Sequence, residues 1–353
     1  MLTRFINIER LTHSFKTAIA CGIALLVTRL LGLNHTPWIV ITTIVVMCAQ
    51  LYVGSVMQKA YLRFLGTLVG CLFAITTLET VGDSNLAIGI TIGLSSLIFS
   101  YFATGQENVS YTGTLGAVTT AIIMLGQKPT IMIATLRFLE ISIGILIATL
   151  ISQFVLPIHA RTHLRRTQAT TLAQLRDYYI ACMMTPGLGA DAAQSQDLDE
   201  HIVKSLSKQR QLAKEAVREP LGSFYDPEQF IQFLHCEKEI LRAIDFMYHT
   251  AIHIEMVEAR EAAEIKTFND AIVAALNSLI KTIAADKPDP QEHIHLPPLQ
   301  PLKNKLHTMF AQASQDELIY INGFLYSVET LTQWLDTLSK LYQVPVCKEP
   351  ATA

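Results

Sequence analysis

Charged residues are scarce in this chain, and the scarcity is uneven. They make up 16% of its 353 residues, whereas soluble domains usually carry about 25%. Residues 1–157 hold only 8 of the 27 Lys and Arg and 5 of the 30 Asp and Glu. This first part is too poor in charge for a soluble domain, whereas residues 158–353 have an ordinary soluble composition. The contrast predicts a domain boundary near Pro157.

The signatures of several protein classes are also missing. The six cysteines occur singly, without the CxxC spacing of a zinc knuckle, so neither a disulfide framework nor a structural zinc site is indicated. No phosphate-binding glycine loop and no nucleophile elbow occur. The acidic second part offers no electrostatic surface for nucleic acid. We therefore expect no enzyme, no cofactor, no metal, no nucleic-acid partner, and no ATP-driven pumping by this chain alone.

Apolar sequence, by contrast, is abundant. A helix that spans a bilayer needs about 20 mostly apolar residues. Six stretches qualify, at 14–33, 37–54, 61–79, 86–103, 109–126 and 135–156. No small-residue cleavage site follows the first stretch, so we expect it to be retained rather than removed as a signal peptide. The sequence predicts an all-α, polytopic membrane protein with a six-helix transmembrane domain at 14–157, preceded by an interfacial arm at 1–13.

Aromatic and glycine residues in these stretches predict how the helices are placed. Trp38 opens the second stretch and is predicted to anchor it at the membrane interface. Glycines spaced four residues apart allow neighbouring helices to approach closely. On this basis we expect helix packing at Gly66 and Gly70 and at Gly89 and Gly93, and we also expect it at Gly144.

The distribution of positive charge predicts the orientation. Positive residues gather in the N-terminal arm, in the predicted 54–62 loop with Lys59 and Arg63, and after Pro157, and such regions stay on the cytoplasmic side. Both termini are therefore predicted to be cytoplasmic, with Lys128 as a minor exception. Beyond Pro157, periodic polar segments predict a cytoplasmic helical bundle over 158–353 without strands. Its helices are expected at 158–184, 197–218, 227–259, 261–285, 299–312 and 315–342.

An internal repeat is visible within the apolar part. The segment Leu62-Arg63-Phe64-Leu65, with Gly70, Leu72 and Ala74 after it, recurs at the same offsets from Leu136-Arg137-Phe138-Leu139. A second echo links the stretches that begin at Thr42-Thr43 and at Thr119-Thr120. Three predicted spans separate the copies, so the second copy enters the membrane from the opposite side. This predicts a 3+3 inverted repeat of the kind found in many transporters.

Cationic residues in the predicted spans are the sharpest candidates for a transport pathway. The predicted topology places Arg63 near the cytoplasmic end, with Lys59 close by, and Arg29 and Arg137 near the outer end. Cations at both mouths suit a path for organic anions, but they also suit side chains that reach for lipid headgroups, and the residues alone leave both open. Glu140 follows Arg137 by one helical turn. It could bind a coupling proton or simply neutralise the arginine.

Two further groups have weaker functional readings. In the fifth stretch, Thr112 and Thr119 fall on one polar helix face, which either lines a pathway or supports helix packing. In the second part, His249 and His253 are spaced to share a metal, with Glu255 nearby and a His293-x-His295 pair further on. The spacing supplies no complete ligand set, so no metal site is predicted.

Taken together, these residues resemble a known family. Pro37-Trp38, Lys59 with Arg63-xx-Gly66-Thr67-xx-Gly70, Arg137-xx-Glu140-xxx-Gly144 and the closing Pro157 are similar to the fusaric acid resistance / aromatic acid exporter superfamily. The plant aluminium-activated malate transporters belong to the same broad group. The resemblance covers roughly residues 10–160, and a weaker one extends to Glu219-Pro220.

The resemblance implies an inner-membrane exporter of aromatic or other organic carboxylates. With the arginines as anion sites and Glu140 as a proton site, we expect the proton gradient to drive it. Many bacterial relatives carry two such membrane units, whereas this chain has one, which favours a homodimer. Relatives often work with a periplasmic adaptor, but no residue here identifies one. Two alternatives stay open beside the exporter: a passive organic-anion channel on the same scaffold, and a membrane scaffold without transport.

Overall fold

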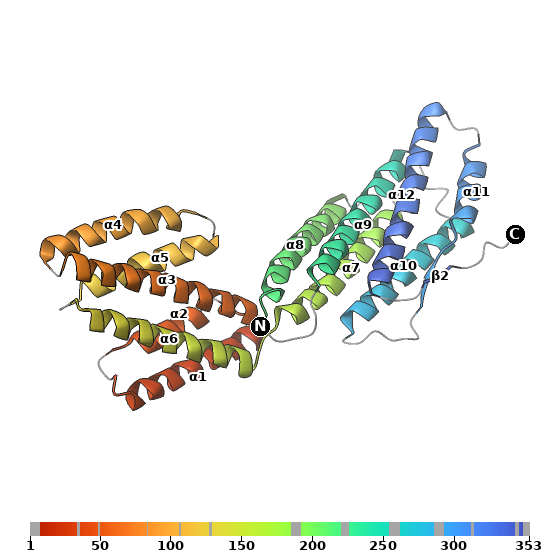
Figure 1. Ribbon diagram of the computed structural model, residues 1–353. Helices are drawn as coiled ribbons and strands as arrows, with labels where there is room; N and C mark the ends of the chain where they lie inside the picture. Colours follow the sequence, from red (N-terminus) through yellow and green to blue (C-terminus); the bar gives the residue numbers. More distant parts are fainter. Residues whose placement is uncertain are drawn as a thin grey trace. The chain divides into compact units, whose positions relative to one another are not determined.

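The computed structural model describes residues 8–33, 36–48, 50–82, 84–105, 107–126, 129–184, 192–219, 226–253, 262–285, 293–311, 314–342 and 346–348 (Figure 1). The chain divides into two compact units. One comprises Met1–Ala160 with Val217–Gly222, and the other comprises Arg161–Ala216 with Ser223–Ala353.

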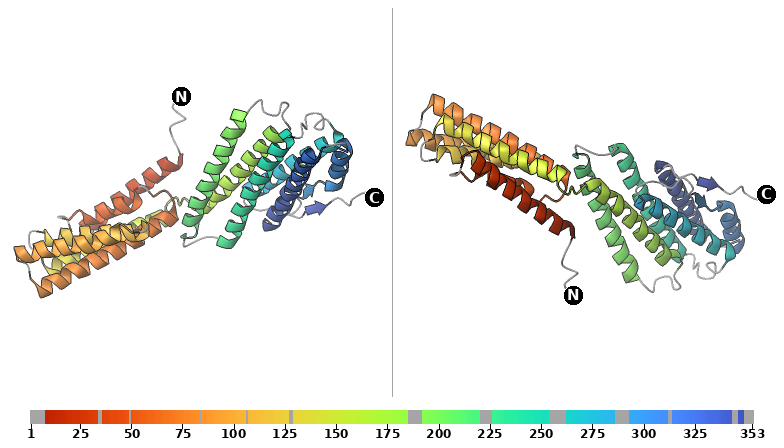
Figure 2. Two further views of the ribbon diagram at one scale, coloured as in Figure 1. Left: turned by 90° about the horizontal axis from the view of Figure 1, so that it is seen from above. Right: turned by 90° about the horizontal axis from the view of Figure 1, so that it is seen from below.

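The first unit contains six described helices: α1 (Ile8–Leu30), α2 (Trp38–Met47), α3 (Val53–Thr80), α4 (Asn85–Ala103), α5 (Glu107–Met124) and α6 (Ile131–Phe154). Figure 1 and both views of Figure 2 show α1 and α4 at opposite edges of this unit. Helix α1 begins at Ile8, inside the predicted interfacial arm, while residues 1–7 lie outside the described part of the chain.

Four of the six predicted spans are long and apolar enough to cross a membrane: α1, α3, α4 and α6. The predicted span at 37–54 is not one helix, because α2 has only 10 residues and Cys48 is extended. At 1.5 Å per residue, α2 covers about 15 Å, or half of the hydrocarbon core. Its run of Ile, Thr and Val residues has low helix propensity, which is consistent with this early end. Helix α5 has 18 residues but is diluted by hydroxyl side chains and glycines.

The loop predicted at 54–62 is helical instead. Helix α3 begins at Val53 and runs for 28 residues, so Lys59 and Arg63 both lie within it. Met, Gln, Lys, Ala and Leu in this segment are good helix formers, and tertiary packing can extend the helix through them. Arg63 therefore lies about 15 Å along α3 rather than at a helix end, where it was predicted.

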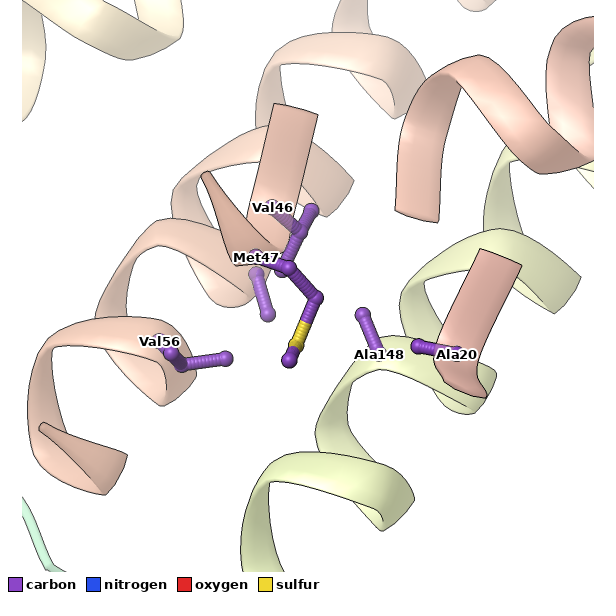
Figure 3. Close-up of a cluster of buried hydrophobic side chains, with 6 residues drawn as sticks. Ala20, Val46, Met47, Val56 and Ala148 are labelled. Atoms are coloured by element: carbon purple, nitrogen blue, oxygen red, sulfur yellow. The ribbon is translucent and has the colours of Figure 1, made fainter. Parts of the chain in front are cut away.

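Small side chains hold α1, α2, α3 and α6 together. One buried cluster consists of Ala20, Val46, Met47, Val56, Ala60 and Ala148. Figure 3 shows the Met47 side chain extending from the end of α2 into the space between Val56, Ala20 and Ala148. The alanines allow the helix backbones to approach, and the flexible methionine fills the remaining gap.

The second unit is helical, as predicted, with one small exception. Its helices are α7 (Ala160–Met183), α8 (Ala192–Ala216), α9 (Pro227–His253), α10 (Ala263–Ala284), α11 (Leu299–Met309) and α12 (Gln315–Leu341). Local caps explain two of the helix starts: Asp226 accepts from the Glu228 amide, and Ser314 forms a capping box with Glu317. The expectation of no strands is wrong, because β1 (Ile294–Leu296) pairs in parallel with β2 (Val346–Lys348).

A carboxyl group is buried in the helix core of this second unit. Glu237 on α9 is fully buried, and its Oε2 accepts a 2.7 Å hydrogen bond from Gln209 on α8. The same Gln209 amide donates to Thr171 on α7 at 2.7 Å, and Thr171 contacts Ser205. Burial raises the pKa of Glu237 well above its ordinary value of 4.5, and the Gln209 bond lowers it by less. The folded protein therefore favours a neutral Glu237.

We expect the second unit to lose stability as the pH rises because of this residue. The fold retains a proton that the unfolded chain releases above about pH 4.5, so the free energy of unfolding falls by up to about 1.4 kcal/mol per pH unit. The fall ends where folded Glu237 ionises. Glu237→Gln should flatten the profile and raise the melting temperature at alkaline pH. Melting curves from about pH 5 to 8.5 test this.

The matched control is Glu228→Gln, which removes an exposed carboxylate from the same helix and should keep the wild-type profile. Identical pH profiles for the wild type and Glu237→Gln would contradict the prediction.

Candidate functional site

Helix α2 lies directly against the backbone of α6. A Cβ atom at Gly144 would lie 2.7 Å from the carbonyl oxygen of Ile39 and 2.8 Å from the Cβ of Thr42. The Thr43 hydroxyl donates to the Gly144 carbonyl oxygen at 3.2 Å. Only a residue without a side chain allows this approach, so Gly144 fixes how closely α2 and α6 pack.

The same arrangement recurs between α5 and α3. A Cβ atom at Gly70 would lie 2.6 Å from the carbonyl oxygen of Gly116 and 2.9 Å from the Cβ of Thr119. The Thr120 hydroxyl donates to the Gly70 carbonyl oxygen at 3.1 Å. Because these residues are the partners of the first set in the sequence repeat, the two halves of the unit share one local packing geometry.

The two copies of the repeated motif meet where α3 crosses α6. Near the end of α3 the Cys71 thiol lies 3.7 Å from the Ala134 carbonyl oxygen, near the start of α6. Further back along α3, the rings of Phe64 and Phe138 have centroids 5.5 Å apart. The contacts show that α3 and α6 run in opposite directions, as an inverted repeat requires.

Arg63 is buried at this crossing. Its residue is 6% exposed, and its Nη2 donates to the Thr42 hydroxyl on α2 at a long 3.4 Å. Its Nε has no hydrogen-bond partner among the described residues, and none of their ion pairs involves it. A buried guanidinium normally has a carboxylate or several acceptors. Arg63 therefore presents unused donors inside the first unit.

Arg137, the repeat partner of Arg63, is paired instead. Its Nη1 lies 2.9 Å from Oε2 of Glu140, one turn further along α6. Its guanidinium carbon also lies 4.9 Å from the ring centroid of Trp38, at the start of α2. The tryptophan predicted as an interface anchor thus makes a cation–π contact with an arginine of another helix.

Glu140 breaks the symmetry of the two halves, because the matching position in the first copy of the repeat is Gly66. Glu140 is completely buried, and its Oε1 has no partner among the described residues. One oxygen of the Glu140 carboxylate is thus ion-paired, while the other is unused. We call Trp38, Thr42, Arg63, Arg137 and Glu140 the two-arginine site.

A second group of basic residues surrounds the end of α2. Nε2 of His13 lies 3.1 Å from the Met47 carbonyl oxygen, and Lys59 donates to the Cys48 carbonyl oxygen at 3.1 Å. Cations are favourable at these carbonyls because they form the negative end of the helix dipole.

Lys16 is also buried, and its Nζ lies 3.4 Å from the Ser152 carbonyl oxygen on α6. Sequence reasoning missed Lys16 and His13, although Lys16 fell inside the first predicted span.

The other predicted pathway residues are dispersed. Arg29 is exposed in the last turn of α1. Thr112 contacts the Leu62 carbonyl oxygen at 3.4 Å, and Thr119 lies against Gly70, so both are in the contact between α3 and α5. The described contacts do not join these three residues to the two-arginine site, and their role in a pathway stays a prediction.

The predicted packing glycines fall into two groups. Gly66, like Gly70 and Gly144, lies against a neighbouring backbone, since a Cβ there would be 2.7 Å from the Thr112 carbonyl oxygen. Gly89 and Gly93 on α4 are exposed and have no atom within 4 Å of a Cβ position. Their predicted packing is therefore not made within the described part of this chain.

The histidines of the second unit have ordinary partners. His249 lies 3.5 Å from Asp245, and His253 stacks on Tyr320. No group of three or more possible metal ligands occurs among the described residues, and Glu255 lies outside them.

A buried carboxylate also lies at the end of the first unit. Glu219 accepts a hydrogen bond from the Ala160 amide at the start of α7, and it lies 3.6 Å from His159. A negative charge there is favourable because it faces the positive end of a helix dipole. This contact ties residues 217–219 to the end of the first unit, while Pro220, the other residue of the Glu219-Pro220 resemblance, lies outside the described residues.

Comparison with known proteins places most of the first unit in one family. The model of the fusaric acid resistance protein family matches residues 10–222, which is more than half of the chain. The chain belongs to this family. The family assignment and the apolar helices together identify it as a membrane protein.

One curated protein with a similar sequence is the inner membrane protein YeeA of Escherichia coli (strain K12). It is 25% identical over 198 residues, which are 56% of this chain and 54% of that protein. The match thus spans about half the length of each. The fusaric acid resistance match also confirms the resemblance carried by the arginine and glycine motifs.

Proposed function

We propose that this protein is a transporter and not an enzyme, and that it exports aromatic or other organic carboxylates across the inner membrane by using the proton gradient. We also propose that it acts as a homodimer. The family and the name of the relative support the location. The observation that carries the proposal is the buried Arg63, whose guanidinium has unused donors and no described carboxylate partner. A substrate carboxylate has the charge and geometry to satisfy it.

In this proposal the two repeated arginines have different tasks. Arg63 binds the substrate anion, while Arg137 holds Glu140 in place until Glu140 takes up a proton. Protonation would release Arg137 from its ion pair and free a second cation for the anion. The proposed topology places both termini, and the second unit, in the cytoplasm.

A passive organic-anion channel is the second candidate. The observation that favours it is the near identity of the contacts at Gly144 and Gly70, which means that the two halves of the unit share one local conformation. A carrier in an inward-facing or outward-facing state would be expected to have different helix contacts in its two halves. A channel would conduct according to voltage and would be indifferent to Glu140→Gln.

The proposal predicts the behaviour of three variants in proteoliposomes loaded with labelled benzoate. Arg63→Met should lower benzoate flux about tenfold or more, because a charged hydrogen bond to the substrate is lost. Glu140→Gln should abolish the response to an imposed pH gradient. Arg210→Met removes an exposed arginine of α8 and should leave the flux unchanged. All variants are compared at equal amounts of folded, reconstituted protein.

Each outcome separates the candidates. Flux driven by the pH gradient and lost in the first two variants supports the exporter. Flux that follows voltage and ignores both the gradient and Glu140→Gln supports the channel. Absence of flux for benzoate and several other aromatic acids would contradict both.

A further inference from the structure

Lys16 is a buried cation that the two-arginine site does not use. It lies about 12 Å along α1 from Ile8 and is completely buried. Its one described hydrogen bond reaches the Ser152 carbonyl oxygen at 3.4 Å, and none of the ion pairs between described residues includes it. An ammonium group carries three donors, and a charge inside a membrane protein is costly unless it is paired or functional.

Two neighbouring polar groups are also incompletely bonded. The Ser152 hydroxyl is buried and has no partner among the described residues. His13, one turn before Lys16, uses Nε2 for the Met47 carbonyl oxygen, while its buried Nδ1 has no described partner. Ala20 lies one turn after Lys16 on α1, and Ala148 lies one turn before Ser152 on α6. Both alanines belong to the buried cluster shown in Figure 3.

The scaffold itself does not require a cation at this position. Buried residues recur at every fourth position in α1, at 16, 20, 24 and 28, and likewise in α4, at 87, 91, 95 and 99. The first residue of this buried stripe in α4 is Ala87, so a stripe of this kind forms without a cation at its start.

We infer that Lys16 and Ser152, with His13 beside them, form a binding site for a carboxylate anion. The Lys16 ammonium pairs with the carboxylate, the Ser152 hydroxyl donates to its second oxygen, and Nδ1 of His13 donates when it carries a proton. One full charge and a few donors suit a monovalent carboxylate better than a divalent phosphate. The inference rests on the proposed function, because the site would be a second station for the exported anion.

Thermal shifts of the detergent-purified full chain test this site without measuring transport. Saturating sodium benzoate should raise the wild-type melting temperature by about 2–4 °C. Lys16→Met should melt at a higher temperature than the wild type without benzoate, because an unpaired buried charge is gone. Its benzoate shift should be smaller than that of the wild type, because only the proposed site at Arg63 then remains. Ser152→Ala should bind benzoate about tenfold more weakly. Lys208→Met, which removes an exposed lysine of α8, should respond like the wild type.

The other outcomes overturn the inference. A benzoate shift of unchanged size in Lys16→Met would show that the anion does not bind at Lys16, and a response to chloride or phosphate but not to benzoate would refute the carboxylate assignment. A wild type that ignores all three anions would refute the site. A smaller benzoate shift in Lys16→Met with no flux in the wild type would keep the site and refute the exporter.

Discussion

Replacing Gly70 with alanine is expected to destabilise the first unit by about 1–3 kcal/mol, the cost of overpacking a tight contact. The new Cβ would lie 2.6 Å from the Gly116 carbonyl oxygen and 2.9 Å from the Thr119 Cβ. The closer of these is a backbone atom, so no flexible side chain can move aside. Gly144→Ala should cost a similar amount, since its Cβ would meet the equivalent atoms on α2 at 2.7 and 2.8 Å.

Gly89→Ala is the matched control, because Gly89 lies within a helix of the same unit but has nothing within 4 Å of a Cβ position. Alanine is the better helix former, so this variant should be as stable as the wild type or more stable. Melting temperatures of the purified proteins, followed by size-exclusion chromatography after heating, measure the difference. Equal stability of the Gly70 and Gly89 variants would show that α3 and α5 are not in backbone contact.

Glu140→Gln is expected to destabilise the protein by about 3–5 kcal/mol, the usual cost of removing one partner from a buried ion pair. Glu140 is completely buried and Arg137 is mostly so, and the two are 2.9 Å apart. Without the carboxylate, the arginine loses its ion pair, and the cation–π contact with Trp38 is its one remaining charge interaction among the described residues. Adding Arg137→Met should restore most of the lost stability, because no unpaired charge then remains.

A double-mutant cycle over these two residues measures their coupling free energy from four melting or denaturation curves. Destabilisations that simply add would contradict a direct ion pair. The cycle also serves the transport assay. It shows how far any loss of flux in Glu140→Gln reflects a smaller folded fraction rather than a lost proton site.

The helix boundaries show where local sequence was sufficient. Predicted starts at 227, 299 and 315 coincide with the observed starts of α9, α11 and α12. These helices begin at Asp or Ser caps or directly after prolines, and such signals act over a few residues. The end of α2 and the start of α3 were misjudged, because the apolar run through 37–54 and the charges at Lys59 and Arg63 look like a span and a loop. Helix propensity, which is low in α2 and high at the start of α3, opposes both of these signals.

The candidate site was foreseen only in part. The repeated motif pointed to Arg63 and Arg137, and the spacing of one turn correctly predicted the pair between Arg137 and Glu140. The contacts of Arg63 with Thr42 and of Arg137 with Trp38 join different helices, so spacing within one helix carries no information about them. Lys16 was passed over because a single lysine near the start of an apolar stretch normally reaches for the membrane surface.

The sequence by itself determined that this is a helical membrane protein with a second, polar helical part, and it predicted an inverted repeat in the first part. These properties follow from composition, periodicity and self-similarity, which are local or additive along the chain. Only the tertiary structure decided which cations are buried and which of them have a partner. Burial and pairing depend on helices far apart in the chain, and a difference of one helical turn decides whether a charge meets a carboxylate, a carbonyl or nothing.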